Sequence, residues 1–196
     1  KKPIQDIPAL WPRAGGIVDW PVGDGAAGKG ANTVWGRRPA LIFDVPKGER
    51  AFPSGVKIEP FTEAQLVRQV ITPLVQALQE FAALGVTHRA LRPDNLFYQV
   101  GRDGPLRLGE CFSMPPGFAQ PVNFETIENA VADPYGRGTG VVADDLYALG
   151  VLLLHLHVGH DPTEGMSDED IISAKITAGS FAALAGREKL STTMAE

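Results

Sequence analysis

The feature that most constrains this chain is a largely apolar run of 13 residues, Leu146–Val158, directly after the acidic pair Asp144-Asp145. A helix that crosses a bilayer needs about 20 apolar residues, so this run is too short to span a membrane. A long apolar segment of this kind predicts a buried helix instead. We therefore expect a helix from Asp145 to Val158 that ends at Gly159 and that the rest of the chain has to cover.

Composition favours one folded unit with an internal core. The chain has 196 residues, of which 44% are hydrophobic, and a formal net charge of −5. This length suits one domain, or one lobe and part of another. The negative charge offers no basic face to nucleic acid or to anionic lipid. Cys111 is the only cysteine, which excludes an internal disulfide and fits a reducing, cytoplasmic setting.

A second strong helical pattern begins at Thr62, which forms a capping box with the glutamine three residues later. Gly85 provides the stop. Pro73 lies inside the pattern, where it removes a backbone donor and crowds the carbonyl four residues back, so we expect a kink near Thr72. The apolar face predicted by the helical spacing consists of Leu66, Val67, Val70, Ile71, Leu74, Val75, Leu78, Phe81 and Leu84.

Shorter patterns predict the remaining elements. Ala40–Phe43 is a short apolar run that predicts one buried strand. Asn95–Val100 and Pro105–Leu108 flank a glycine-containing turn and predict a β-hairpin. A third helix, capped by a serine, is predicted over residues 168–178. Residues 109–140 are rich in glycine and proline with little period, so we expect a long irregular segment there.

The most specific motif is the segment His88-Arg89-Ala90-Leu91-Arg92-Pro93-Asp94-Asn95. It resembles the catalytic loop of protein kinases, H-R-D-x-x-x-x-N, with one departure. At the position of Ala90 the family carries an aspartate, which accepts the substrate hydroxyl proton. A methyl group neither accepts a proton nor orients a hydroxyl. The loop therefore indicates the fold of a kinase and argues against the usual kinase chemistry.

Other segments resemble kinase motifs, in the family's order and at plausible intervals. The helix predicted over residues 62–84 resembles the long helix that precedes the catalytic loop. From about residue 40 to about residue 180, the chain resembles a degenerate member of the bacterial Ser/Thr protein kinase family. The remaining matches are the hinge-like Ala40–Val45, the D-F-G-like region Leu106–Phe112, the central helix start Asp145–Val151 and the G-x-x-P-like Gly159–Pro162.

This resemblance implies an α+β, protein kinase-like fold. Its main part would be a predominantly helical C-lobe over residues 47–196, with a short β-hairpin at the catalytic loop. Residues 1–46 would form a truncated N-lobe remnant and the hinge. The family's hinge holds adenine, so the resemblance makes Asp44 and Val45 the candidate cofactor-binding residues.

The D-F-G-like segment departs from the family pattern at each of its three positions. Glu110 replaces the metal-holding aspartate with a carboxylate that is one methylene longer. Cys111 replaces the phenylalanine that packs between the lobes, and Phe112 replaces a glycine and adopts positive φ less readily. Asn95 is retained, so the resemblance leaves Asn95 and Glu110 as candidate Mg²⁺ ligands.

We expect no catalytic residue in this degenerate loop, and the resemblance implies structural roles for most of it. His88 would be buried and bonded to backbone, and Asp145 would tether the loop through backbone amides or simply cap its helix. Arg89 would pair with a phosphorylated activation loop, or serve as a generic surface or backbone-bonding arginine. Arg92 replaces the usual lysine with a forked donor set. Asp94 occupies a position that is ordinarily solvated.

The phosphate-gripping half of an ATP site is missing from the sequence. No segment resembles the family's valine-alanine-isoleucine-lysine strand or its partnering glutamate, and only about forty residues precede the hinge. We therefore expect no cofactor; ATP and Mg²⁺ would be the cofactors of an active form.

Two further patterns resemble binding motifs: a glycine-rich segment and a group of histidines. Gly23–Gly30 matches both G-x-G-x-x-G and G-x-x-x-x-G-K, but no serine or threonine follows the lysine, as a P-loop requires. Its flanks, Ile17–Pro21 and Asn32–Pro39, form a poor strand and a poor helix, so we expect a loop between strands. Three histidines also lie near the end of the predicted central helix and just after it, but the two on the helix point to different faces, so we expect no shared metal ion. They are His155, His157 and His160.

Two function classes follow. The first is a pseudokinase, kept as a binding or regulatory module for a protein partner in the cytoplasm. We expect that partner to contact residues 109–140 and the surface around the third helix. The second is an atypical Ser/Thr protein kinase that transfers phosphate from Mg·ATP, with Asn95 and Glu110 on the metal. A P-loop nucleotide hydrolase is a weaker third interpretation.

Overall fold

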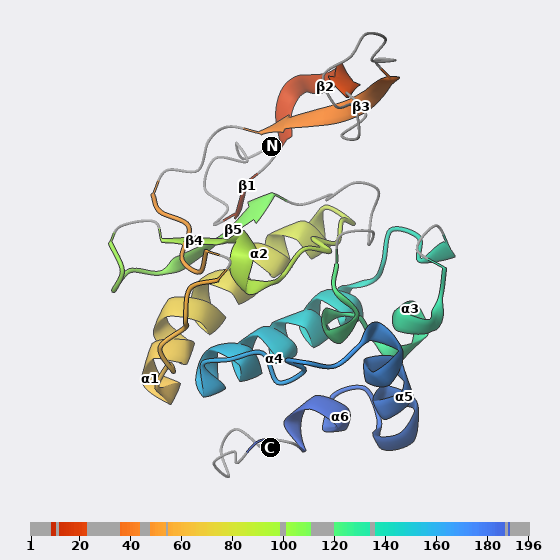
Figure 1. The fold of residues 1–196 in the computed structure, drawn as a ribbon. Coiled ribbons are helices and arrows are strands. Elements are labelled where there is room, and N and C mark those ends of the chain that lie inside the picture. The colour runs from red at the N-terminus through yellow and green to blue at the C-terminus, as the bar shows by residue number, and fades with distance from the viewer. Residues whose placement is uncertain are drawn as a thin grey trace, which may run out of the picture.

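The computed structural model describes residues 9–10, 12–22, 36–43, 48–53, 55–98, 101–110, 120–133, 136–186 and 188, with backbone alone before residue 48 and at Glu110. Figure 1 shows the arrangement of the described elements. In chain order they are β1 (Ala9–Leu10), β2 (Pro12–Val22), β3 (Gly36–Phe43), α1 (Glu63–Gln65), a π-helical stretch (Leu66–Ile71), α2 (Thr72–Ala83), a 3₁₀ turn (Pro93–Asn95), β4 (Leu96–Tyr98), β5 (Leu106–Glu110), a second 3₁₀ turn (Val122–Phe124), α3 (Ile127–Val131), α4 (Val142–Val158), α5 (Asp168–Ala178) and α6 (Ala182–Ala185).

The apolar run forms α4, which lies below α2 in Figure 1. The helix begins at Val142, three residues before the predicted start, because the Asp144 carboxylate accepts a hydrogen bond from the Val141 N–H at 2.8 Å. It ends at Gly159, whose φ of 79° is left-handed. A Cβ on Gly159 would lie 2.8 Å from the Ile58 carbonyl oxygen, so this close approach also requires glycine. The buried residues of α4 are Asp145, Ala148, Leu149, Val151, Leu152, Leu154 and Leu156.

The long helix before the loop has an irregular first half. The π-helical stretch Leu66–Ile71 lies directly before the position of the expected kink. Pro73 has no N–H to donate, and the Thr72 N–H and hydroxyl both donate to the Val67 carbonyl, five residues back. The proline effect predicted from the sequence therefore takes the form of a π-helical stretch.

The start and the buried face of this helix largely follow the prediction. The Gln65 N–H donates to Thr62 Oγ1 at 3.3 Å, and the Thr62 N–H donates to Gln65 Oε1 at 2.9 Å, which confirms the capping box. The prediction that Val67 and Leu84 belong to the buried apolar face is wrong, since each side chain is more than half exposed. The predicted face residues that are buried are Leu66, Val70, Leu74, Leu78 and Phe81.

The β-hairpin predicted at the loop is confirmed as β4 and β5, in which Leu96 pairs with Leu108. Two neighbours of this hairpin were not predicted. β1 pairs in parallel with β5, and Arg50 forms an isolated antiparallel bridge with Phe97. Both neighbours are distant in sequence, and neither forms a repeating pattern that local periodicity could reveal.

The segment Ile17–Pro21, judged a poor strand from the sequence, lies inside β2, so that prediction is wrong. β2 and β3 form an antiparallel two-stranded ribbon, with Val22 opposite Gly36 and Ile17 opposite Leu41. Each strand of such a ribbon has a free edge, where a proline costs no ladder hydrogen bond. The pairing of two distant segments, rather than an apolar alternation, defines this strand.

Residues 109–140 are also more regular than predicted. Within the described part of this range, Val122–Phe124 form a 3₁₀ turn and Ile127–Val131 form α3. These elements are too short to show a helical period in the sequence. Tertiary contacts hold them in place, such as the Ile127 N–H, which donates to Ser180 Oγ at 3.0 Å. The third predicted helix is confirmed as α5, with a capping box at Ser167.

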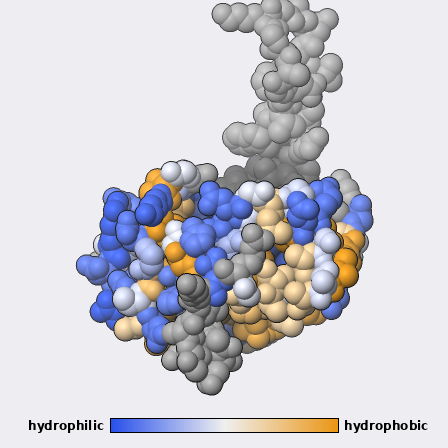
Figure 2. Space-filling model, turned by 60° about the horizontal axis from the view of Figure 1, so that its bottom comes forward, coloured by the Kyte–Doolittle hydropathy of each residue, from blue (hydrophilic) through white to orange (hydrophobic). Residues whose placement is uncertain are grey.

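The surface mixes apolar and charged areas. Figure 2 brings the lower face of Figure 1 forward and shows apolar residues gathered in one continuous area beside hydrophilic ones. Large apolar side chains that remain exposed include Leu146, Ile176 and Phe181. Among the residues that the structure describes, no helix is both long enough and apolar enough to cross a bilayer.

Candidate functional site

Asp145 anchors the loop His88–Asn95 to α4. Its Oδ2 accepts a hydrogen bond from the His88 N–H at 2.7 Å, and its Oδ1 accepts one from the Arg89 N–H at 2.9 Å. Burial raises the pKa of the Asp145 carboxyl, and the two backbone hydrogen bonds oppose that rise. The carboxylate therefore holds backbone 56 and 57 positions away in sequence, which is a tether rather than a helix cap.

His88 fills the space beneath the loop. Its side chain is fully buried and meets the ring of Phe81 edge to face, with 5.4 Å between centroids. Nδ1 accepts a hydrogen bond from the Ala90 N–H at 3.2 Å, and Nε2 lies 3.5 Å from the Gly109 carbonyl oxygen. Burial lowers the pKa of His88 to about 4. A neutral, enclosed imidazole shapes the loop and has no open side on which to meet a substrate.

Ala90, at the position of the catalytic aspartate of kinases, is enclosed by neighbouring residues. Ala90 is completely buried, and its carbonyl accepts a hydrogen bond from Asn95 Nδ2 at 2.9 Å. Gly109 packs against the other side of this amide, since a Cβ there would lie 1.9 Å from Asn95 Oδ1. Asn95 is itself only 2% exposed. The bond to Ala90 uses the amide nitrogen, and the Asn95 oxygen, the atom that a Mg²⁺ site would use, lies on the Gly109 side next to Glu110. Asn95 as a metal ligand therefore remains a prediction.

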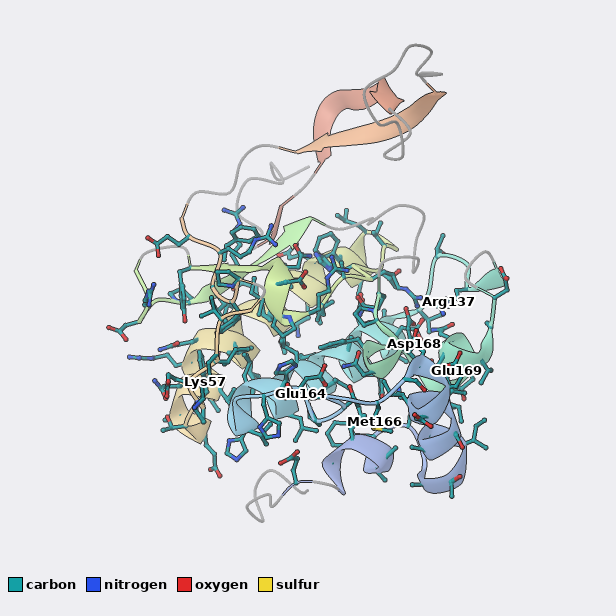
Figure 3. All side chains as sticks on the ribbon, viewed as in Figure 1. Lys57, Arg137, Glu164, Met166, Asp168 and Glu169 are labelled. Carbon is teal, nitrogen blue, oxygen red and sulfur yellow. The ribbon has the colours of Figure 1, made fainter. Side chains whose placement is uncertain are left out.

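Arg89 points into the protein, so the surface role considered from the sequence is wrong. Its Nη2 donates to both oxygens of Glu125 at 3.1 Å, and its Nη1 donates to Asp144 Oδ2 at 2.9 Å. Arg137, labelled in Figure 3, follows α3 and approaches Glu125 Oε1 at 3.8 Å. The φ of Arg89 is 60°, which costs about 1–3 kcal/mol for a residue with a side chain. These ion pairs and the Asp145 tether oppose that strain.

Sequence reasoning missed Lys175, which lies on α5 and is fully buried. Its ammonium donates to the carbonyls of Val122 at 2.8 Å, Asn123 at 3.2 Å and Glu125. It also lies 4.9 Å from the ring centroid of Tyr147. Burial lowers the pKa of Lys175 to about 8. The ammonium thus fixes the backbone that carries Glu125, and no sequence motif signals it because its acceptors are backbone carbonyls of a distant segment.

Arg92 and Asp94 border an open groove of about 410 Å³. Arg92 Nε donates to Asp94 Oδ1 at 2.8 Å, so Asp94 is paired rather than simply solvated. Phe124 and His155 stack at 6.4 Å between ring centroids and also line the groove. The other lining residues are Phe52, Pro53, Gly55, Val56, Ile58, Pro93, Pro121 and Asp161.

The three histidines of the possible cluster have different surroundings. His157 Nδ1 lies 3.2 Å from the Phe61 carbonyl oxygen, and His160 Nε2 lies 3.1 Å from Glu188 Oε1. His155 stacks in the groove. Within the described ranges, no group of three or more His, Cys, Asp or Glu side chains is placed to hold a metal ion.

Several residues singled out from the sequence lie outside the described residues. They include the hinge candidates Asp44 and Val45, the pair Cys111 and Phe112, and the glycine segment 23–30. For Glu110 the structure gives the backbone in β5 alone. The candidate hinge and the Glu110 carboxylate therefore remain predictions.

The chain is similar in sequence to a group of protein kinases. A calcium/calmodulin-dependent serine/threonine-protein kinase of Malus domestica is 30% identical over 148 residues, which are 72% of this chain and 34% of the relative. Calcium-dependent protein kinase 5 of Plasmodium berghei is 24% identical over 149 residues, 72% of this chain and 25% of the relative. No protein-family model matches the chain.

A third relative is the calcium and calcium/calmodulin-dependent serine/threonine-protein kinase of Pisum sativum, 27% identical over 126 residues, 62% of this chain and 24% of the relative. The chain spans between 24% and 34% of the length of these three relatives. The tethered loop after a long helix, the hairpin that follows it and the central α4 agree with this similarity. The chain has a protein kinase-like α+β fold.

Proposed function

We propose that this chain is a pseudokinase domain, which acts as a binding or regulatory module and transfers phosphate poorly or not at all. The observation that carries the proposal is the buried methyl group of Ala90 at the base position, with the Asn95 amide turned onto the Ala90 carbonyl. Loss of a positioned base alone lowers a rate by about 10²–10⁴-fold.

The groove beside the loop supports a polypeptide as the partner. It is open, and it combines an apolar floor at Phe124 with polar groups at Arg92, Asp94 and His155. An extended segment has both apolar side chains and backbone donors and acceptors, which suits this mixture. We propose that the partner segment lies along this groove beside the loop, within the C-lobe of residues 47–196, and that residues 1–46 contribute a remnant of a smaller lobe.

A second candidate is an atypical Ser/Thr protein kinase. The observation in its favour is that the similar curated proteins are Ser/Thr protein kinases. This form would use ATP and Mg²⁺. The chain's own residues would orient the nucleotide through the hinge at Asp44 and Val45, and Asn95 and Glu110 would hold the metal ion.

Calorimetry and thermal shift with ATP, with and without Mg²⁺, decide between the two candidates. We expect no saturable micromolar binding and no transfer of labelled phosphate to a generic substrate. Micromolar Mg·ATP binding together with transfer would refute the pseudokinase.

The variant Ala90→Asp is the companion test. We expect it to stay inactive, because Glu110 departs from the D-F-G pattern and no segment of the given sequence resembles the family's lysine strand. Restored phosphate transfer in this single variant would mean that the rest of the site is intact, in favour of the second candidate.

A further inference from the structure

The loop lies over a buried cluster of charges that balance one another. Three cations, Arg89, Arg137 and Lys175, approach the Glu125 carboxylate closely enough to lower its pKa, against the rise that burial causes. Two further carboxylates, Asp144 and Asp145, complete the cluster and face the Arg89 side. The cluster therefore holds three formally positive and three formally negative side chains. Ion pairs join Arg89 to Glu125 and Asp144, and Arg137 to Glu125.

The cluster joins segments that are far apart in the sequence. Glu125 lies in the segment 120–131, Arg89 in the loop 88–95, and Asp144 at the start of α4. Asp144 Oδ1 also accepts a hydrogen bond from Asn129 Nδ2 of α3 at 2.8 Å. We name Arg89, Glu125 and Asp144 together the carboxylate latch. One guanidinium thus holds the loop, the wall of the groove and the central helix at the same time.

We propose that Glu125 is a built-in anion that keeps the segment 120–131 fixed on the loop 88–95 at all times, so that the partner surface of this domain is assembled without phosphorylation. The inference rests on the proposed function, because the surface that the latch assembles is the proposed partner groove. The partner surface is then always assembled, and no modification switches it on or off.

The geometry leaves no place for an added phosphate at Arg89. The Arg89 side chain is only 3% exposed, its Nη2 already donates to both oxygens of Glu125, and its Nη1 donates to Asp144. Gly140 covers its other side, since a Cβ there would lie 2.6 Å from Arg89 Cδ and 2.8 Å from Nη1. A dianionic phosphate would also add negative charge beside the carboxylates of Glu125 and Asp144, which already pair with Arg89.

Hydrogen exchange measured by mass spectrometry on the whole chain tests the proposal. In Glu125→Gln, which keeps the shape and removes the charge, we expect exchange in residues 120–131 and 88–95 to rise at least tenfold. In Glu125→Asp, which keeps the charge, the rise should stay below threefold. The matched control is Glu128→Gln, three residues along and exposed, which should change neither segment.

Phosphatase treatment of the wild-type protein tests the regulatory half. We expect the same exchange before and after treatment, and an intact mass without phosphate. The proposal is overturned if treatment raises exchange in residues 120–131, or if Glu125→Gln exchanges like the wild type. Should Glu125→Gln fail to fold, Glu125→Asp and the phosphatase comparison still decide. None of these measurements depends on nucleotide binding or transfer, so a failure here is distinct from a failure of the proposed function.

Discussion

Replacement of Asp145 by asparagine changes one heavy atom of the side chain and should destabilise the fold, because this carboxylate holds the loop. The carboxylate accepts hydrogen bonds from two backbone N–H groups, of His88 at 2.7 Å and of Arg89 at 2.9 Å, and it is buried. An asparagine keeps one acceptor and turns an NH₂ group toward the other N–H. Hydrogen bonds to charged groups contribute about 1.5–3 kcal/mol each, and a buried N–H left unpaired costs a similar amount.

The expected loss in the free energy of unfolding for Asp145→Asn is about 2–3 kcal/mol, because relief of the buried charge offsets part of the lost bonding. Urea unfolding followed by circular dichroism measures this loss, and faster amide exchange at His88 and Arg89 locates it. Asp103→Asn is the matched control: Asp103 is exposed in the hairpin turn and should change stability by less than about 0.5 kcal/mol. A loss below about 0.5 kcal/mol in Asp145→Asn would refute the tether.

Three further changes test the core, the loop and the latch. Burial lowers the pKa of His88 from 6.5 to about 4, so stability from the neutral ring is present above pH 6.5 and lost as the pH falls through 4. The wild-type free energy of unfolding should drop across this window by about 3 kcal/mol more than that of His88→Gln, and equal slopes would contradict the assignment. Leu154→Ala removes a fully buried side chain of α4 and should cost about 2–5 kcal/mol in urea unfolding, whereas a loss under about 1 kcal/mol would mean that the site is not core. Gly140→Ala should cost at least about 1 kcal/mol more than Gly138→Ala, because both have positive φ but only Gly140 packs against Arg89, and equal losses would argue against that contact.

Local sequence signals predicted where the helices begin, end and become irregular. The capping boxes at Thr62 and Ser167, the stop at Gly159 and the irregularity before Pro73 all depend on residues within one or two turns of each other. Their physical causes, a cap, a left-handed glycine and a missing N–H, act over a few residues and can be recognised without a partner. The helical spacing predicted side-chain burial less well, since Val67 and Leu84 follow that spacing and are each more than half exposed.

By itself, the sequence determined that the base position holds a methyl group, that the chain resembles a kinase and that α4 had to be buried. Only the tertiary structure decided how the loop is held. The Arg89 guanidinium meets Glu125 and Asp144 across 36 and 55 positions, and the Lys175 ammonium meets backbone carbonyls more than 49 positions away. Such pairs leave no periodic trace, because ion pairing and desolvation depend on distance in space and on exclusion of water, not on spacing along the chain.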